Sequence, residues 1–197
     1  MSERIGRTGN IERNTNETQI RCQLCLDGTG AVSVDTGIGF LDHMLTLLAV
    51  FGSMDLTIKA QGDLHVDAHH TVEDVGIVLG LALKEALGNR QGIRRYGTRF
   101  VPMDETLAMV SLDLCTRAYL HWEAGDLMVT LGFMEAETAQ EFFRAFAMNA
   151  GFTLHARVLY GENTHHKLEA LFKALGQALR EAAAVEGDQV FSTKGLL

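Results

Sequence analysis

Residues 67–74 read Asp-Ala-His-His-Thr-Val-Glu-Asp, and residues 162–169 read Glu-Asn-Thr-His-His-Lys-Leu-Glu. Both stretches contain the pattern His-His-x-x-Glu. Shifting the sequence by 96 positions places residues 69–86 over residues 165–182, and nine of these eighteen positions are identical. A repeat of this length, near half of the chain, is far longer than the period of a solenoid array. We therefore expect an internal duplication, with two copies of one structural unit.

The repeated motif predicts metal ligands on a helix. Apolar residues recur through residues 72–86 at helical spacing. On a helix Glu73 shares a face with both histidines, whereas His69 and His70 point about 100° apart. Adjacent imidazoles therefore reach two different ions more easily than one, so we expect two metal sites, each with ligands from both copies. A surface or capping role is the alternative for an isolated His-His pair, and the repetition argues against it.

The two predicted halves, residues 1–92 and residues 93–197, show the same order of patterns. Three strands are followed by a helix, a strand and a final helix in each half. In the first half these segments are residues 4–14, 18–27, 31–34, 40–51, 55–60 and the motif helix, which ends near Gly88. In the second half they are residues 94–101, 106–122, 127–134, 139–150, 152–159 and 164–185. The sequence therefore predicts an α+β protein with two four-stranded sheets and helices packed on one side of each.

Composition limits the classes of partner. Apolar residues make up 47% of the chain and charged residues 21%, with one proline, as in an ordered globular protein. The net charge of −8 argues against nucleic acid or an anionic membrane as the main partner. Three cysteines and the lack of a recognisable secretory signal or long apolar run favour a cytoplasmic location. Cys22-x-x-Cys25 lies in an alternating segment, so a strand position is favoured over a redox or zinc site.

Alignment of the two halves extends the set of metal ligands. His43 opens the first predicted helix of one half, and Glu141 holds the matching place in the other. A structural role for His43 and a solvated helix carboxylate for Glu141 are the alternatives. The full predicted set is His43, His69, His70, Glu73, Glu141, His165, His166 and Glu169. Imidazole and carboxylate ligands without thiolate suit Mn, Fe, Co, Ni or Zn, and this mixture favours a six-coordinate ion such as Mn(II).

Four motifs resemble those of imidazoleglycerol-phosphate dehydratases. They are Phe-Leu-Asp-His-Met at residues 40–44, Asp-x-His-His-Thr-x-Glu-Asp at 67–74, Gly-Glu-Asn-x-His-His-x-x-Glu at 161–169, and Ser-Thr-Lys-Gly at 192–195. The resemblance runs over almost the whole chain. No segment corresponds to the phosphatase domain that some relatives carry, so the chain resembles the monofunctional form.

The resemblance implies a fold, a metal and an assembly. The fold is a duplicated α+β unit, similar to domain 2 of ribosomal protein S5, with helices between the two sheets. The cofactor is Mn(II), two ions per active site. The assembly is a cage-like homo-oligomer, a 24-mer in the family, with active sites between subunits.

The resemblance also implies a reaction of L-histidine biosynthesis. Imidazole glycerol phosphate loses water and becomes imidazole acetol phosphate. Hydroxide is a poor leaving group, so an imidazolate held by two Lewis-acidic ions would help to expel the hydroxyl from the carbon attached to the ring. A general base then removes a proton from the neighbouring carbon to give an enol, which becomes the ketone.

Catalytic and phosphate-binding residues follow from the same resemblance. Glu17 matches the acidic position near the N-terminus and is the expected base, with a solvated strand-end carboxylate as the alternative. The expected phosphate contacts, which include the C-terminal tail, are Arg95, Arg117, Lys173, Ser192 and Lys194. The repeat partner of Lys173 is Ile77, so the copies differ where a charge is needed. Arg94 and Arg99 compete with Arg95 for its role.

The sequence departs from the family pattern at two places. Leu47 and Phe51 stand where some relatives have a polar residue and a histidine, and Asp67-Ala68 replaces a doubly acidic pair. Two other functions remain open. A dinuclear metal phosphoesterase would use similar ligands and release inorganic phosphate, whereas a metal-clamped cage without catalysis would turn over no small molecule.

Overall fold

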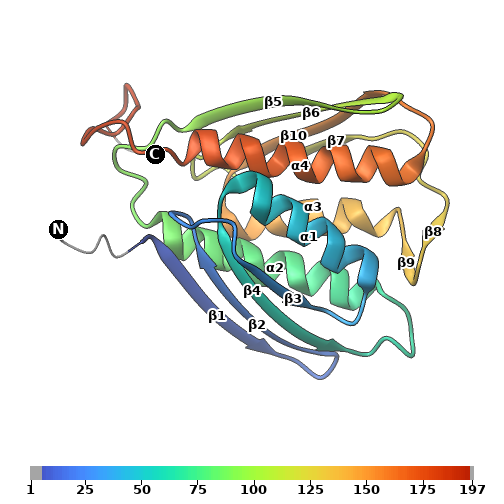
Figure 1. The fold of residues 1–197 in the computed structure, drawn as a ribbon. Coiled ribbons are helices and arrows are strands. Elements are labelled where there is room, and N and C mark those ends of the chain that lie inside the picture. The colour runs from blue at the N-terminus through green and yellow to red at the C-terminus, as the bar shows by residue number, and fades with distance from the viewer. Residues whose placement is uncertain (1–5, 196–197) are drawn as a thin grey trace.

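Four helices form one layer between two four-stranded sheets in the computed structural model, which describes residues 6–195 (Figure 1). The first half contains β1 (Thr8–Asn14), β2 (Thr18–Cys25), β3 (Val32–Asp35), α1 (Gly39–Gly52), β4 (Asp55–Gly62) and α2 (His69–Leu87). The second half contains β5 (Tyr96–Met103), β6 (Thr106–Asp113), β7 (Tyr119–Glu123), β8 (Thr130–Leu131), β9 (Met134–Glu135), α3 (Thr138–Ala150), β10 (Thr153–Tyr160) and α4 (Thr164–Ala182). The α+β architecture is confirmed.

The two sheets have the same connectivity. Their strand orders are β1-β2-β4-β3 and β5-β6-β10-β7. In each sheet three strands are antiparallel, and the third strand of the half, β3 or β7, pairs in parallel with the last one. Strands β2 and β6 both have eight residues and begin 88 positions apart, at Thr18 and Thr106. The duplication is therefore confirmed in three dimensions.

Two strand predictions in the second half were wrong. The segment 106–122 is not one strand, because β6 ends at Asp113 and β7 begins at Tyr119. Leu114 and Cys115 are buried in succession, which a strand with alternating faces does not allow. The segment 127–134 is not the third strand of the main sheet, since β8 pairs only with the short β9.

Smaller differences concern the ends of elements. β1 begins at Thr8, later than predicted, and residues 4 and 5 of the predicted strand lie outside the described residues. α4 ends at Ala182 instead of residue 185. β5 begins after Arg95, whose φ of 76° is left-handed and does not fit a strand.

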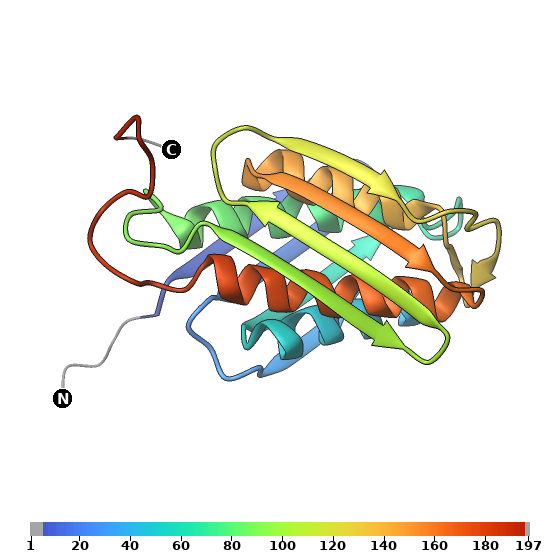
Figure 2. The same cartoon turned by 90° about the horizontal axis from the view of Figure 1, so that it is seen from above.

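Helices pack in pairs that join the two halves. α1 packs against α4, and α2 against α3, while α2 also covers β1 and β2 and α4 covers β5 and β6 (Figures 1 and 2). Gly80 and Gly176 lie at these crossings. A Cβ at Gly80 would stand 2.7 Å from the Phe146 carbonyl oxygen, and one at Gly176 would stand 2.3 Å from that of Leu48. Only glycine permits so close an approach, so the two halves share one core.

The cysteines support a structural role. Cys22 faces the core and Cys25, three residues on, lies on the opposite face of β2. Burial raises the pKa of the Cys22 thiol to about 12, so it is protonated at neutral pH. Within residues 6–195, no helix combines the length and the apolar character needed to cross a membrane.

All four helices begin at the same end of the molecule, on the right in Figure 1. The two motif helices start in different ways. At α4 the Asn163 side chain accepts hydrogen bonds from the backbone N–H groups of His165 and His166. Ala68 provides no side-chain cap for α2, and the Asp67 carboxylate accepts from the His69 N–H at 2.8 Å instead. This end of the helical layer therefore carries both His-His motifs.

Candidate metal centre and active site

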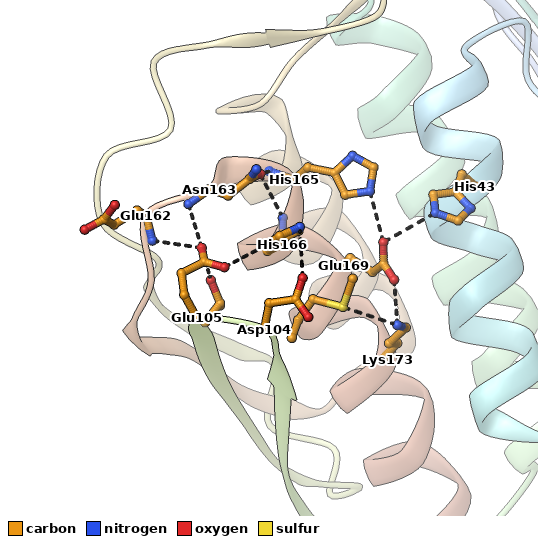
Figure 3. Close-up of polar contacts among 11 residues, drawn as sticks. His43, Asp104, Glu105, Glu162, Asn163, His165, His166, Glu169 and Lys173 are labelled. Atoms are coloured by element: carbon orange, nitrogen blue, oxygen red, sulfur yellow. Dashed lines mark hydrogen bonds and ion pairs between the residues drawn. The ribbon is translucent and has the colours of Figure 1, made fainter.

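Three predicted ligands come together where α1 meets α4. The Nε2 atoms of His43 and His165 lie 3.5 and 3.0 Å from Oε2 of Glu169, and the ligand atoms all lie within 4.8 Å of one another (Figure 3). His43 belongs to the first half and the other two to the second. Two partly exposed imidazoles and a buried carboxylate are a donor set that fits a divalent transition metal.

Lys173 lies on the other side of the Glu169 carboxylate. Its Nζ is 2.5 Å from Oε1 and only 16% of its side chain is exposed. The ammonium also lies 5.3 Å from the centre of the Phe51 ring, a cation–π contact. Burial opposes ionisation of Glu169, but the hydrogen bonds from Lys173 and His165 outweigh it and lower the pKa of that carboxyl. Glu169 is therefore a carboxylate between a lysine and two histidines.

His166 contacts the tight turn between β5 and β6. Its Nδ1 lies 2.7 Å from Oε2 of Glu105, and its Nε2 lies 3.9 Å from Oδ2 of Asp104 (Figure 3). The other Glu105 oxygen accepts from the backbone N–H groups of Asn163, at 2.9 Å, and Glu162, at 3.2 Å. The His166 contact and then the Asn163 N–H hold the pKa of Glu105 well below its usual range.

The start of α2 has a comparable arrangement around His70. Its Nδ1 lies 3.0 Å from Oδ2 of Asp63, which follows β4, and its Nε2 lies 3.9 Å from Oε1 of Glu17. Glu17 lies in the turn between β1 and β2 and its side chain is 54% exposed. The Asp63 hydrogen bond raises the pKa of His70. The expected base therefore lies beside a predicted metal ligand.

The remaining predicted ligands stay apart. Nε2 of His69 is 4.0 Å from Oε2 of Glu73, while the Glu141 carboxylate pairs with Arg144 at 3.0 Å. Among the described residues, the triad of His43, His165 and Glu169 is the only close group of three or more potential ligands. A single chain therefore brings one predicted ligand group together. The repeat-related residues His69, Glu73 and Glu141 do not form such a group within the chain.

Four of the five predicted phosphate contacts line one cavity of about 870 Å³. They are Arg95, Arg117, Ser192 and Lys194. Arg95 binds the Asp113 carboxylate through Nε and Nη2, at 2.6 and 2.9 Å, and donates to the Phe191 carbonyl oxygen. It therefore ties the C-terminal tail to the sheet. Arg117 and Lys194 are more exposed, and Arg117 has only a longer ion pair with Asp113, at 3.7 Å.

The competing arginines lie elsewhere. Arg94 pairs with Glu181 at 3.3 Å, and Arg99 contacts the same carboxylate. Neither lines the cavity, so Arg95 is the one of the three arginines that lies with the other predicted phosphate contacts. The fifth predicted contact, Lys173, is also outside this cavity and lies with the metal triad.

The cavity and the metal triad lie at opposite ends of α4. His165 is in its first turn, whereas the Arg95 N–H donates to the carbonyl oxygen of Ala182, its last residue. A helical rise of 1.5 Å per residue separates those positions by about 25 Å. One small molecule cannot contact both within a single chain.

Sequence reasoning missed Asp63, Glu105 and Asp113. A signal for Glu105 was present, because Asn-Glu-Thr at residues 16–18 recurs as Asp-Glu-Thr at residues 104–106, with a shift of 88 instead of 96. Glu105 is therefore the repeat counterpart of Glu17. Asp63 lies in a turn between a strand and the motif helix, where a carboxylate is ordinary and signals nothing by itself.

Known proteins resemble this chain over nearly its full length. The family model of imidazoleglycerol-phosphate dehydratase matches residues 36–179. The imidazoleglycerol-phosphate dehydratase of Streptococcus thermophilus is 58% identical over 193 residues, covering 97% of this chain and 100% of that protein. That of Acetivibrio thermocellus is 56% identical over 191 residues, covering 95% and 97%.

Solved structures agree with the sequence relatives. The crystal structure of the Staphylococcus aureus imidazoleglycerol-phosphate dehydratase has a TM-score of 0.82 at 39% identity, covering 90% of this chain and 99% of that one. The Pyrococcus furiosus structure, in complex with (S)-C348, has a TM-score of 0.83 at 37% identity, covering 95% and 100%. The chain therefore belongs to the imidazoleglycerol-phosphate dehydratase family, the dehydratases of histidine biosynthesis.

Proposed function

We propose that this protein catalyses the metal-dependent loss of water from imidazole glycerol phosphate, giving imidazole acetol phosphate. Family membership supports the reaction class, and the triad of His43, His165 and Glu169 is the observation that carries the metal dependence. An imidazole substrate is itself a nitrogen ligand, so a site built from imidazole and carboxylate donors suits it.

The donor set fits two Mn(II) ions per active site. His43, His165 and Glu169 would provide ligands to one of these ions. The remaining predicted ligands, which would complete the two sites, are His69, His70, Glu73, Glu141 and His166. Bound Mn(II) would supply Lewis-acid activation of the substrate ring and its hydroxyl.

Glu17 is the proposed general base. Its carboxylate is largely exposed and lies beside His70, so it can reach a substrate held at the ligand end of the molecule. Its turn is fixed, because the backbone N–H groups of Glu17 and Thr18 both donate to Thr15 Oγ1. Glu17 would take the proton from the carbon next to the departing hydroxyl, which leaves an enol that becomes the ketone.

Arg117, Ser192 and Lys194 are the proposed phosphate contacts, and Arg95 positions their loop. The exposed Arg117 guanidinium and the Lys194 ammonium offer charge-assisted hydrogen bonds in a protein that is acidic overall. Arg95 is committed to Asp113 and Phe191, so its contribution is to hold the tail against the cavity. Lys173 would approach the phosphate from the metal side.

The complete active site is proposed to form between copies of the chain. Two facts support this. The phosphate cavity lies about 25 Å from the triad along α4, and the group of His69, Glu73 and Glu141 stays open within one chain. A neighbouring subunit would bring its cavity to the ligand end, and repetition of that contact would build the cage-like homo-oligomer.

The experiment is a turnover assay with two products measured in one tube. Mn(II)-loaded protein is incubated with imidazole glycerol phosphate, and the ketone is followed by its absorbance while inorganic phosphate is determined separately. The proposal requires ketone without phosphate release. Phosphate without ketone would identify a phosphoesterase. The absence of both products would identify a cage that only binds metal.

A further inference from the structure

The second histidine of each motif has a carboxylate on Nδ1. For His70 it belongs to Asp63, at 3.0 Å, and for His166 it belongs to Glu105, at 2.7 Å. The two carboxylates come from different places, since Asp63 follows β4 and Glu105 lies between β5 and β6. The repeat has therefore reached the same contact with unrelated residues, which indicates that the contact itself is required.

The contact determines which ring nitrogen is available. An ionised carboxylate only accepts hydrogen bonds, so the neutral imidazole beside it must carry its proton on Nδ1. The lone pair is then on Nε2, which lies away from that carboxylate. The first histidines differ, because Nε2 of His165 and His69 faces the glutamate four residues on. Within residues 6–195, no side chain forms a hydrogen bond or ion pair with their Nδ1.

We propose that Asp63 and Glu105 are positioning residues that fix the tautomer and ring orientation of His70 and His166, so that Nε2 is the metal ligand in both. This inference rests on the metal sites of the proposed function. A carboxylate behind a ligating histidine keeps the ring in place and makes its free nitrogen a better donor.

Glu105 has a second task that Asp63 lacks. Its other oxygen accepts from the backbone N–H groups of Glu162 and Asn163, so it fixes the start of α4 to the β5–β6 turn (Figure 3). Among the described residues, the carboxylate of Glu17, the repeat counterpart of Glu105, accepts no backbone N–H, and it lies on the Nε2 side of His70. The duplicated position thus provides Glu105, which contacts His166, in the second half and Glu17, the expected base, in the first half.

Equilibrium binding of Mn(II) to the assembled protein is the first test, with free Mn(II) measured by its electron paramagnetic resonance signal. Loss of a carboxylate behind a ligating histidine typically weakens metal affinity by about 10–100-fold. We expect that loss in Glu105→Ala and in Asp63→Ala. Glu105→Gln keeps one acceptor oxygen, which can serve the Nδ1–H of His166 or the backbone donors but not both, so its loss should be smaller than that of Glu105→Ala. Glu162→Ala is the control, because Glu162 binds Glu105 through its backbone N–H, and its side chain forms no hydrogen bond or ion pair with any other described residue.

The tautomer gives a readout that a purely structural role would not change. Nitrogen-15 spectra of the metal-free protein should show His70 and His166 protonated on Nδ1, and each alanine variant should lose that signature for its own histidine. Wild-type Mn(II) affinity and tautomers in both alanine variants, with only a lower melting temperature, would overturn the proposal. If Glu105→Ala fails to fold, Asp63→Ala and Glu105→Gln decide by the same criteria.

These outcomes are separable from the fate of the proposed reaction, because Mn(II) binding needs no substrate. A protein that fails to dehydrate imidazole glycerol phosphate but loses Mn(II) affinity in both alanine variants would keep the positioning role and lose the activity. Wild-type protein without measurable Mn(II) binding would overturn the positioning role, whatever the turnover assay gives.

Discussion

The starts of α2 and α4 carry the same His-His-x-x-Glu motif in different surroundings. At α4, His165 and Glu169 meet His43 from the other half within 4.8 Å. At α2, His69 and Glu73 are 4.0 Å apart, and Glu141, the counterpart of His43, turns to Arg144. Equal motifs therefore do not give equal arrangements: one set of predicted ligands comes together in a single chain, and the other does not.

The largest expected effect is on assembly, where both helix starts contribute. Removing Mn(II) with a chelator, or replacing one ligand from each start by His70→Ala plus His166→Ala, should reduce the particle to a smaller oligomer of folded subunits. Metal that binds only the assembled form stabilises that form. Light scattering measures the mass, and added Mn(II) should rebuild the wild-type particle. A metal-free particle of full size would show that metal does not hold the subunits together.

Turnover should separate the repeat counterparts Glu17 and Glu105. Glu17→Gln removes a proton acceptor, so kcat should fall by about 10²–10⁴-fold while fold and metal content stay unchanged. Glu105→Gln removes no proposed base and keeps one of the two acceptor oxygens, so its kcat should fall much less. Steady-state kinetics at saturating Mn(II) provide the comparison. Equal losses in both variants would mean that the two positions have not diverged in role.

The KM for the phosphorylated substrate should depend on lysines from both ends of the molecule. A charge-assisted contact is worth about 1.5–3 kcal/mol, so Lys173→Ala or Lys194→Ala should raise KM by about 10–150-fold. Lys59→Ala, on the exposed face of β4, is the control. An unchanged KM for both variants would remove the phosphate assignment. A Lys173 variant with altered Mn(II) affinity and normal KM would make Lys173 only the counter-ion of Glu169.

The smallest expected effect is on the free energy of unfolding, at the two glycines where helices of the two halves cross. An added Cβ meets backbone oxygen at both, at 2.3 Å for Gly176 and 2.7 Å for Gly80. Overpacking of this kind costs about 1–3 kcal/mol, and Gly176→Ala should be the more destabilising. Gly187→Ala is the control, since nothing lies within 4 Å of its added Cβ. Chemical denaturation ranks the three, and a Gly80 variant less stable than the Gly176 variant would contradict the order.

The sequence predicted the duplication and both sheets because the apolar alternation and the repeated motif are local patterns. It misplaced the third strand of the second half, since Leu114 and Cys115 leave the sheet to be buried in succession, which alternation cannot reveal. It named both His-His motifs but not the carboxylates that contact His70 and His166. Asp63 and Glu105 act through contacts set by tertiary folding, and the 25 Å between the triad and the phosphate cavity follows from helix direction.

The pairing of helices across the halves also makes each half depend on the other. A chain ending near residue 92 would keep its own sheet, but α1 would lack α4, and α2 would lack α3. Since the second half is a copy of the first, a second molecule of that shorter chain would offer equivalent surfaces to both helices. Each half therefore takes the place that a partner subunit would have for the other, and the contact surface between the halves lies inside one chain.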